Sequence, residues 1–255
     1  AADGIDVVAT LGGDGTANEA ANGLAGGATA LAPLPGGATN VLARLLGAPR
    51  DLAEATHRLA QTAAKGSPPP RRIDLGRVNG RAFTFSGGIG LVAAIVRRAD
   101  ERPRLKARLR QWCFAASALE VLGREFLVDP PRMEVEVDGR TIPGVTLVVQ
   151  NADVLTFFAD HPLRVADGAR LDGGTLAGAV LRRAAPLDVP AIALRLFTRA
   201  PVAAHPHVEP FGGVRALRCV ASDGRPLPLE VDGEHLGEVR EARYELLPGA
   251  LAVLA

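Results

Sequence analysis

The chain has 255 residues, 47% of them hydrophobic, and its 29 basic and 28 acidic side chains leave a formal net charge of +1. This length suits one large or two modest hydrophobic cores, and the near-neutral charge gives no reason to expect a nucleic-acid partner. Cys113 and Cys219 are the only cysteines, which argues against a disulfide framework or a zinc site and favours a reducing compartment.

The sequence shows neither a signal peptide nor the run of roughly 18 to 20 apolar residues that spans a bilayer. It starts with Ala1, and its first predicted strand comes within ten residues. We therefore expect the natural N-terminus to be missing.

The first part of the chain alternates between strand and helix patterns. Apolar runs predict buried strands, and apolar residues at helical spacing predict helices. The predicted strands cover residues 5–11 and 30–34, and the predicted helices cover 16–24, 40–46 and 52–64. Repetition of strand, glycine loop and helix indicates a parallel α/β sheet.

The pattern changes after the stretch KGSPPPRR at residues 65–72, which predicts a stiff extended connector. Residues 72–78 and 81–86 read as strands joined at the hairpin dipeptide Asn79-Gly80, and residues 105–126 read as one helical segment. Further short strands are predicted at 133–137, 145–150, 176–181, 214–221, 229–231, 241–247 and 251–254. Their spacing indicates an antiparallel, sandwich-like domain.

The stretch GGDGT, at residues 12–16, follows the first strand. Glycines leave backbone N–H groups uncovered, and the start of the next helix adds partial positive charge, so the loop predicts an anion site. It matches neither the P-loop nor the GxGxxG fingerprint. Asp14 beside phosphates is consistent with Mg²⁺ between them. Capping of the helix by Asp14 is the alternative, and the local chemistry leaves both open.

A second glycine turn, PLPGGATNVLAR at residues 33–44, also lies between a strand and a helix. Two such loops at neighbouring strand ends form the crevice in which open α/β sheets bind ligands. Thr39 and Asn40 could donate to phosphate or ribose. Taken alone, this turn is better explained as a plain turn with a helix N-cap at Thr39 or Asn40.

GGDGTANE followed by PGGATNVLAR resembles the catalytic domain of the diacylglycerol kinase, sphingosine kinase and ceramide kinase superfamily, and most closely the bacterial soluble lipid kinases. The resemblance covers nearly the whole chain and includes RIDLGRVNGRAF, FSGGIGL, ARLDGGTL and VDGEHLG. GGDGT alone is shared with NAD kinases, whereas GGDGT with a late DGE in a strand-rich domain is more specific.

The resemblance implies an α/β nucleotide-binding domain and an antiparallel β-sandwich domain, with the site in the cleft between them. We expect the first domain to comprise residues 1–72 with a C-terminal return at 246–255, and the substrate-binding domain to comprise residues 73–245. In the family a further strand and helix at the N-terminus supply another nucleotide contact, and they are absent from this chain, in line with a truncated start.

The implied activity is transfer of the γ-phosphoryl group of ATP to a lipid hydroxyl such as that of diacylglycerol, with Mg²⁺. A carboxylate that accepts the proton of the alcohol assists such a reaction. Likeness to the family puts Glu234 in this role, with Asp232 orienting it or joining the metal network. The expected nucleotide-binding residues are Gly12, Gly13, Asp14, Gly15, Thr16, Asn18, Glu19, Gly36, Gly37, Thr39 and Asn40, and the expected metal ligands are Asp14, Asp74 and Asp172.

Plainer explanations exist for these residues. Asp232-Gly233-Glu234 would on composition alone be a surface hairpin turn, and Asp138-Gly139 is read as one. Asn18 and Glu19 could lie on a solvated helix face, and Asp74 could be an ordinary strand-end residue. The chain also departs from its relatives: an Asp is lost after Asn40 and another near Leu91, and Asp172-Gly173-Gly174 replaces Asp-Asp-Gly.

Three other features carry weaker hypotheses. His205-Pro206-His207 resembles half of a metal site, but the sequence shows no spaced partner, so a surface turn is expected. Trp112, with Leu109, Phe114 and Leu119, forms an apolar helix face that is expected to pack in the core rather than to line a lipid groove. The basic stretch 97–110 is expected to be a solvated helix face, with docking on anionic membrane as the alternative.

The sequence thus predicts a cytoplasmic kinase that is peripheral at the membrane, uses ATP and Mg²⁺, and meets a lipid substrate there. We expect no nucleic-acid partner and no transmembrane segment, and we leave a homodimer open. An NAD kinase-like enzyme and a catalytically inactive nucleotide-binding regulator are the alternatives.

Overall fold

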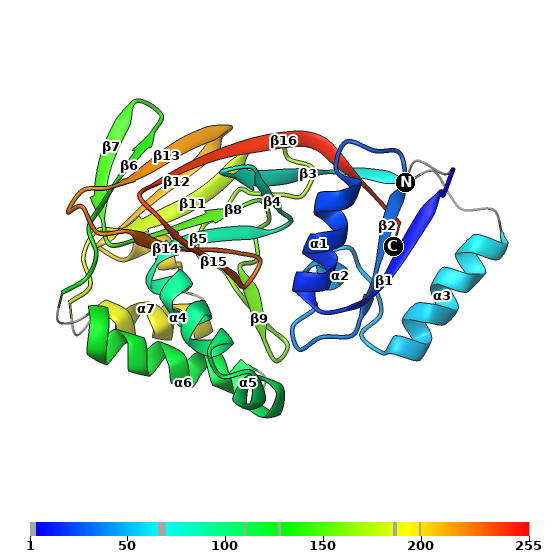
Figure 1. Cartoon of the computed structure of the whole chain (residues 1–255), viewed down its shortest axis with the longest axis horizontal. Coiled ribbons are helices and arrows are strands. Elements are labelled where there is room, and N and C mark those ends of the chain that lie inside the picture. The colour runs from blue at the N-terminus through cyan, green and yellow to red at the C-terminus, as the bar shows by residue number, and fades with distance from the viewer. Residues whose placement is uncertain are drawn as a thin grey trace.

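The computed structural model describes residues 4–65, 70–109, 111–126, 129–185, 188–198 and 200–254. It has two unequal parts: a small α/β layer and a larger antiparallel sandwich (Figure 1). Prolines 68 and 69, part of the predicted connector, lie outside the described residues. No described helix is long and apolar enough to cross a membrane.

The α/β layer is built as the sequence predicts. The parallel strands β1 (Val7–Gly12) and β2 (Ala30–Pro35) are followed by the helices α1 (Asp14–Leu24), α2 (Val41–Leu45) and α3 (Leu52–Ala64). Leu31 and Leu42 are fully buried in the core that α1 and α2 share with the sheet. Both glycine loops therefore leave the same edge of the sheet.

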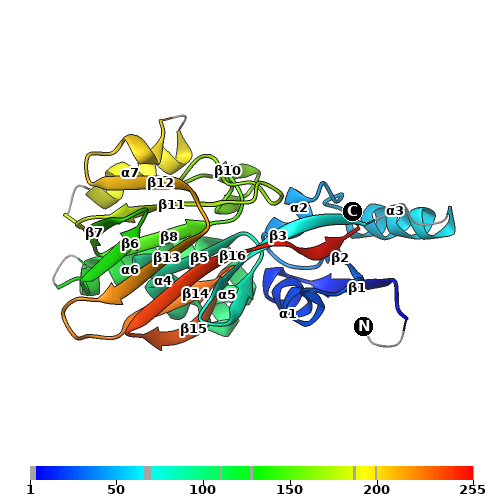
Figure 2. The ribbon, with the colours of Figure 1, turned by 90° about the horizontal axis from the view of Figure 1, so that it is seen from above.

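The strand β16 (Glu241–Val253) joins the two parts. Its end pairs parallel with β2, at Val253 and Leu31, while its beginning lies in the sandwich (Figure 2). The sequence predicts two strands here. They form one strand because the irregularity at Pro248-Gly249, where Gly249 has φ +56°, shifts the register without ending the pairing.

Two sheets enclose the main core. An eight-stranded sheet has the order β1-β2-β16-β13-β6-β7, with β3 (Arg71–Val78) paired to β16 and β4 (Arg81–Phe83) paired to β3. A six-stranded antiparallel sheet has the order β12-β11-β8-β5-β14-β15. The remaining strands are β5 (Ser86–Gly90), β6 (Met133–Val137), β7 (Arg140–Gly144), β8 (Thr146–Gln150), β11 (Leu176–Leu181), β12 (Val208–Val214), β13 (Ala216–Ala221), β14 (Leu227–Val231), β15 (Glu234–Val239) and the hairpin of β9 (Thr156–Phe158) and β10 (His161–Leu163). The predicted fold class is confirmed.

Several predicted boundaries are wrong for identifiable reasons. The strand expected at residues 81–86 ends at Phe83, because residues 84–86 turn their backbone N–H groups to Asp232 as the chain crosses to the other sheet. The strand expected at residues 214–221 starts two residues later, at Ala216, because Val214 is the last residue of a strand in the other sheet and Gly213 has φ +73°.

The helices over the sandwich were predicted only in part. The expected segment 105–126 contains α5 (Pro103–Leu109), α6 (Gln111–Val121) and a π-helical turn, η1 (Leu122–Phe126). The helices α4 (Leu91–Asp100) and α7 (Asp188–Phe197) and the short 3₁₀ turn η2 (Val202–Ala204) were not predicted.

Candidate active site

The two glycine loops pack backbone against backbone. The amide of Gly36 donates to the carbonyl oxygen of Gly12 at 3.0 Å. A Cβ on Gly37 would lie 2.4 Å from the Cα of Gly13, and a Cβ on Gly36 would lie 2.8 Å from the nitrogen of Gly12. Side chains are excluded here because the loops touch each other, whether or not a ligand is bound.

This contact sets the first turn of α1 at the carboxyl end of two parallel strands. Gly13 is the N-cap residue and makes no side-chain capping bond. The first N–H groups of a helix have no partner within the helix, and their positive dipole end favours an anion. Gly15 and Thr16 belong to this turn, so their backbone lies where a helix favours an anion, and phosphate binding there stays a prediction.

Asp14 links the two loops. Its carboxylate accepts a hydrogen bond from the Thr39 hydroxyl at 2.7 Å and one from the Leu42 amide at 3.3 Å. It thus caps α2, and the hypothesis that it caps its own helix is wrong, because it is the first helical residue after Gly13. Burial raises the pKa of Asp14 to about 6. A carboxylate that has lost water in this way would be stabilised by a nearby cation.

The polar side chains of the second glycine loop form hydrogen bonds within the protein. Asn40, at φ +48°, is the N-cap residue of α2, but its side chain does not cap the helix. Its Oδ1 accepts from the amide of Gly37 at 2.7 Å, and its Nδ2 donates to the carbonyl of the same residue at 3.1 Å. Thr39 donates to Asp14. Their contacts with a nucleotide stay predictions.

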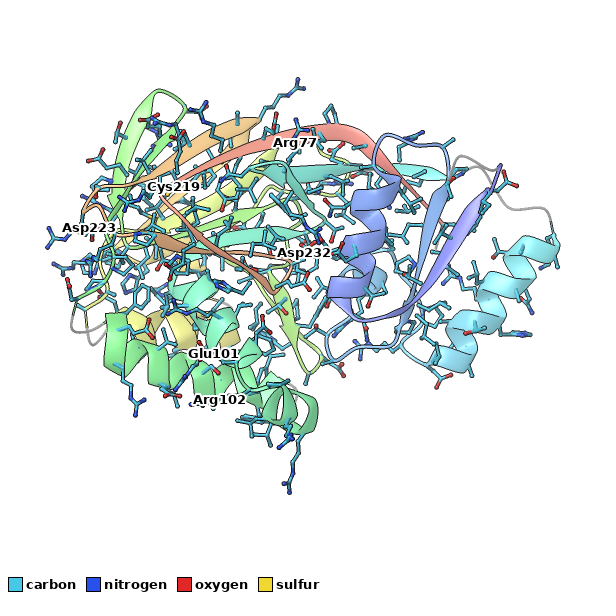
Figure 3. The ribbon with its side chains drawn as sticks, viewed as in Figure 1. Arg77, Glu101, Arg102, Cys219, Asp223 and Asp232 are labelled. Carbon is cyan, nitrogen blue, oxygen red and sulfur yellow. The ribbon has the colours of Figure 1, made fainter. Side chains whose placement is uncertain are left out.

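Asp232 is not in a surface turn. It has the backbone of a two-residue hairpin between β14 and β15, with φ +48° at Asp232 and +78° at Gly233, yet only 3% of it is exposed. It lies between α1 and the sandwich (Figure 3). Burial raises the pKa of Asp232, and hydrogen bonds to its carboxylate oppose that shift. These come from the Thr84 amide and hydroxyl at 2.6 and 2.8 Å, the Phe85 and Ser86 amides at 3.0 Å each and the Asn18 amide group at 2.8 Å.

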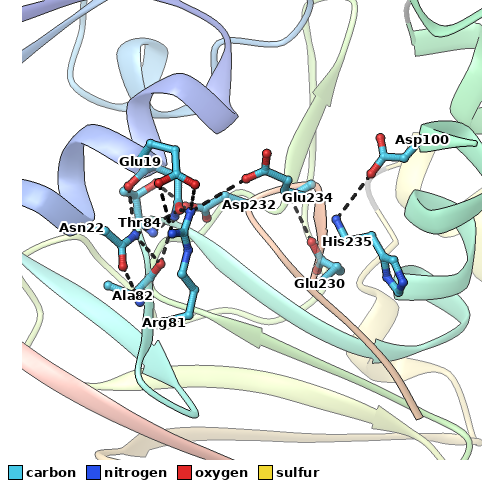
Figure 4. Close-up of polar contacts among 12 residues, drawn as sticks. Glu19, Asn22, Arg81, Ala82, Thr84, Asp100, Glu230, Asp232, Glu234 and His235 are labelled. Atoms are coloured by element: carbon cyan, nitrogen blue, oxygen red, sulfur yellow. Dashed lines mark hydrogen bonds and ion pairs between the residues drawn. The ribbon is translucent and has the colours of Figure 1, made fainter. Parts of the chain in front are cut away.

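The same turn brings Glu234 over the first glycine loop. A Cβ on Gly15 would lie 3.3 Å from Oε1 of Glu234. Oε2 is 3.9 Å from Nη2 of Arg81 and has no hydrogen-bond partner among the described residues, although the side chain as a whole is 45% exposed (Figure 4). Residues from opposite ends of the chain therefore place the Glu234 carboxylate, which is ion-paired with Arg81, beside the N-terminus of α1.

Asn18 and Glu19 are held by Arg81, whose role the sequence did not indicate. Arg81 donates to Oδ1 of Asn18 at 2.7 Å and to Oε1 of Glu19 at 2.5 Å (Figure 4). Asn18 is fully buried and also donates to the carbonyl of Ala82 at 3.0 Å. The solvated-face explanation is thus wrong for Asn18 and fits Glu19, which is exposed.

Arg81 and Thr84 are the residues that sequence reasoning missed. Both lie in the RIDLGRVNGRAF–FSGGIGL stretch that carries part of the family resemblance. An arginine and a threonine flanking a short buried strand were the available signal, but the sequence does not show that this strand faces Asp232.

The three predicted metal ligands do not form one cluster. Asp74 is buried and accepts from the amides of Gly174 and Gly249 at 2.7 Å each, so it ties the Asp172–Gly174 loop to β16. Asp172 accepts from Arg71 at 2.7 Å. Within the described residues, none of the three predicted ligands belongs to a group of three or more ligand atoms within 4.8 Å of one another. Asp14 alone stands beside the phosphate site.

An aromatic surface, defined here as Trp112, Phe158 and Phe197, lies on the sandwich side. The rings meet edge to face, with centroids 5.0 Å apart for Trp112 and Phe158 and 5.2 Å for Phe158 and Phe197. Trp112 is 61% exposed and Leu119 is 75% exposed. The prediction that this helix face packs in the core is therefore wrong.

Comparison with known proteins agrees with this geometry. Residues 1–78 match the family model described as the diacylglycerol kinase catalytic domain. Residues 87–255 match the model described as the YegS C-terminal NAD kinase beta sandwich-like domain. The second model alone matches more than half of the chain.

Curated relatives and solved structures extend the similarity. The chain is 29% identical over 91% of its length to a diacylglycerol kinase of Bacillus subtilis (strain 168) and 25% identical over 92% to one of Staphylococcus carnosus (strain TM300), and it spans 72% of each. Two solved structures of proteins from Bacillus anthracis str. Sterne share the fold, with TM-scores of 0.72 and 0.67. Their identities are 23% and 22%, and the matches cover 99% and 97% of this chain and 77% of each structure.

Proposed function

Because this chain belongs to the diacylglycerol kinase family, we propose that it transfers the γ-phosphoryl group of ATP to the hydroxyl of a lipid, with diacylglycerol as the first acceptor to test. The observation that supports the proposal is the position of Glu234 against Gly15, which would bring the proposed proton acceptor to the proposed phosphate site. Phosphoryl transfer depends on positioning and charge neutralisation more than on covalent help from the protein.

The residues of the first turn of α1 would hold the phosphates. The backbone amides of Gly15 and Thr16 are at the helix N-terminus, where an anion is favoured. Mg²⁺ in kinases is held by one or two carboxylates together with phosphate oxygens. The desolvated carboxylate of Asp14 fits that ligand type, and bound Mg²⁺ would neutralise phosphate charge there.

Glu234 would take the proton of the acceptor hydroxyl. The Glu234 side chain is 45% exposed, and its buried Oε2 has only the ion pair with Arg81 and no hydrogen bond from any described residue, so the carboxylate has room to accept a proton. Asp232 holds the turn that carries Glu234, and all five of its hydrogen bonds go to the protein. Asp232 is therefore proposed as a positioning residue rather than a catalytic one.

The lipid would be met at a membrane surface. Support comes from the exposed aromatic surface, from exposed Leu119 and Leu194, and from exposed Arg104 and Arg108 on α5. Exposed apolar side chains next to cationic ones favour the boundary of an anionic membrane. This surface belongs to the same part of the chain as Glu234, so both contribute to acceptor binding in the proposal.

The test is transfer of label from γ-labelled ATP, in Mg²⁺, to mixed micelles containing diacylglycerol, with NAD⁺ in a parallel tube. We expect label in a chloroform-soluble product. We expect Glu234→Gln to lower that transfer about 10²- to 10⁴-fold while ATP binding persists, and Glu134→Gln, on the exposed face of β6, to leave it unchanged.

Other outcomes would redirect the proposal. Label in NADP would move the chain to an NAD kinase-like activity. ATP binding without transfer to any lipid extract would favour a regulatory protein. If Glu234→Gln transferred label to the lipid as fast as the unaltered chain, Glu234 would not be the proton acceptor.

A further inference from the structure

Asp188, the first residue of α7, lies close to His205 and His207. The helix α7 lies against the sandwich, away from β1 and α1 (Figure 1). Oδ1 of Asp188 is 2.9 Å from Nδ1 of His207 and 3.9 Å from Nε2 of His205. One ligand atom from each residue lies within 4.8 Å of the other two. The folded chain thus supplies the partner that His205-Pro206-His207 lacks in the sequence.

Local backbone structure fixes these side chains. Oδ2 of Asp188 accepts from the amide of Ala185 at 3.0 Å, which leaves Oδ1 facing the histidines. His205 follows η2, and the carbonyl of His207 accepts from the amide of Arg182 at 2.9 Å, which ties this segment to the end of β11. The ligands are therefore carried by backbone that is held on both sides.

Burial separates this group from an ordinary surface turn. The side chains of Asp188 and His205 are only 9% and 8% exposed, whereas that of His207 is 27% exposed. Two buried polar groups and a half-buried third leave one open side, which is an entry path for an ion. Val202 and Val208, on either side of the histidines, pack in a small core with Leu181, so the histidines are anchored by apolar neighbours.

Two imidazoles and one carboxylate are a ligand set for Zn²⁺ and related divalent ions. Bonds of about 2.0–2.2 Å in a tetrahedral site place ligand atoms roughly 3.3–3.6 Å apart. The 2.9 and 3.9 Å separations lie on either side of that spacing, so small side-chain rotations would complete it.

Binding of an ion would require contacts of Arg183 and of His205 to break. Nε of Arg183 is 3.9 Å from Oδ2 of Asp188 and 3.3 Å from Nδ1 of His207, but the Arg183 side chain is 66% exposed and can turn to solvent. Nδ1 of His205 accepts from the amide of His207 at 3.3 Å, a long contact whose loss is minor.

We propose that Asp188, His205 and His207 bind one Zn²⁺ ion, with water in the fourth position of the tetrahedron, and that this ion fastens the start of α7 to the segment before β12. The site is independent of the proposed kinase activity. At its other end α7 carries Phe197 of the aromatic surface, so the ion would also hold that ring in place.

The test uses the whole chain freed of metal by a chelator, then titrated with Zn²⁺ against a chromophoric competitor. We expect one Zn²⁺ per chain and a higher melting temperature in Zn²⁺. We expect His207→Gln to weaken binding at least ~10- to 100-fold and to lose the thermal shift, since even second-shell changes cost that much. His57→Gln, on the exposed face of α3, is the matched control and should behave as the unaltered chain.

Circular dichroism confirms that each variant is folded, and Asp188→Asn gives a second ligand change. Uptake of less than 0.1 ion per chain at about 10 µM Zn²⁺ would overturn the proposal, because structural sites bind much more tightly. Equal uptake by His207→Gln and Asp188→Asn would also overturn it, by assigning the ion to other groups.

Discussion

Asp138-Gly139 and Asp232-Gly233 have the same backbone and different surroundings. Both aspartates have φ +48° and both glycines have positive φ, so each dipeptide forms a hairpin turn. Asp138 is exposed, as predicted, whereas Asp232 is buried with five hydrogen bonds. Local sequence predicts the turn in both cases, but burial decides which aspartate holds the site, and burial comes from residues far along the chain.

Glu230 is a third carboxyl group beside this turn, and it carries a pH prediction. It is fully buried, its Oε2 accepts from the amide of Gly233 at 2.9 Å, and burial raises its pKa from 4.5 to about 8. Between these values the folded protein keeps a proton that the unfolded chain has released. The free energy of unfolding therefore falls as pH rises toward 8, by at most about 1.4 kcal/mol per pH unit.

Urea unfolding of the unaltered chain and of Glu230→Gln between pH 6.5 and 8 measures this effect. This pH range starts above the raised pKa of Asp14, about 6, so that titration of Asp14 contributes little to the slope. Glu230→Gln should flatten the decrease, and Glu134→Gln, which changes an exposed carboxylate, should not. The same slope in all three proteins would show that Glu230 is already ionised in this range.

At the scale of elements, contact between the two glycine loops is the feature that a single substitution can remove. Gly37→Ala places a methyl 2.4 Å from the Cα of Gly13. We expect a loss of about 1–3 kcal/mol in the free energy of unfolding, as for other overpacked sites, together with weaker ATP binding because the first turn of α1 shifts. Gly23→Ala, within α1, places a methyl that meets nothing within 4 Å. This substitution should stabilise the chain by about 0.5–1 kcal/mol.

Chemical unfolding and ATP titration of both variants separate the two effects. If Gly37→Ala keeps ATP affinity while losing stability, the loops support the fold but do not position phosphate. If Gly37→Ala changes neither quantity, the close packing of the loops is not needed.

The elements that the sequence predicted well are those with a clear local signal. The helix at residues 52–64 is found with the predicted bounds, because its apolar spacing and the Asp51 cap, which accepts from the amide of Glu54, are both local. The single strand β16 was read as two, since its pairing with β3 and β2 overrides the Pro248-Gly249 break. Helix α7 was missed, and with it the Asp188 partner of the two histidines.

At the scale of the whole molecule, the predicted site residues come together only because α1 is fastened to the sandwich. The glycine loops and the proposed catalytic residue, Glu234, could be predicted from motifs that resemble a family. Their supports, Arg81 and Thr84, could not, because no local pattern says that β4 faces α1. Asn18 and Asn22 reach across this boundary to Ala82, and Asn18 alone also reaches Asp232. Figure 4 shows Asn22 beside Ala82.

This difference gives a prediction about the boundary. Asn18→Ala and Asn22→Ala each remove hydrogen bonds between α1 and β4, so each should lower the free energy of unfolding by about 1–3 kcal/mol. Only Asn18→Ala also removes a hydrogen bond to the carboxylate of Asp232, and the turn that contains Asp232 sets Glu234 above Gly15. A displacement of about 1 Å at a reacting group can cost on the order of 100-fold in rate. We therefore expect kcat to fall roughly 10- to 100-fold in Asn18→Ala with KM for ATP unchanged, and to change little in Asn22→Ala.

Steady-state kinetics on both variants, at a temperature where each is folded, makes the comparison. Equal losses of kcat would mean that the boundary acts only through stability, and an altered KM for ATP in Asn18→Ala would mean that Asn18 serves the nucleotide side of the site rather than the turn that carries Glu234.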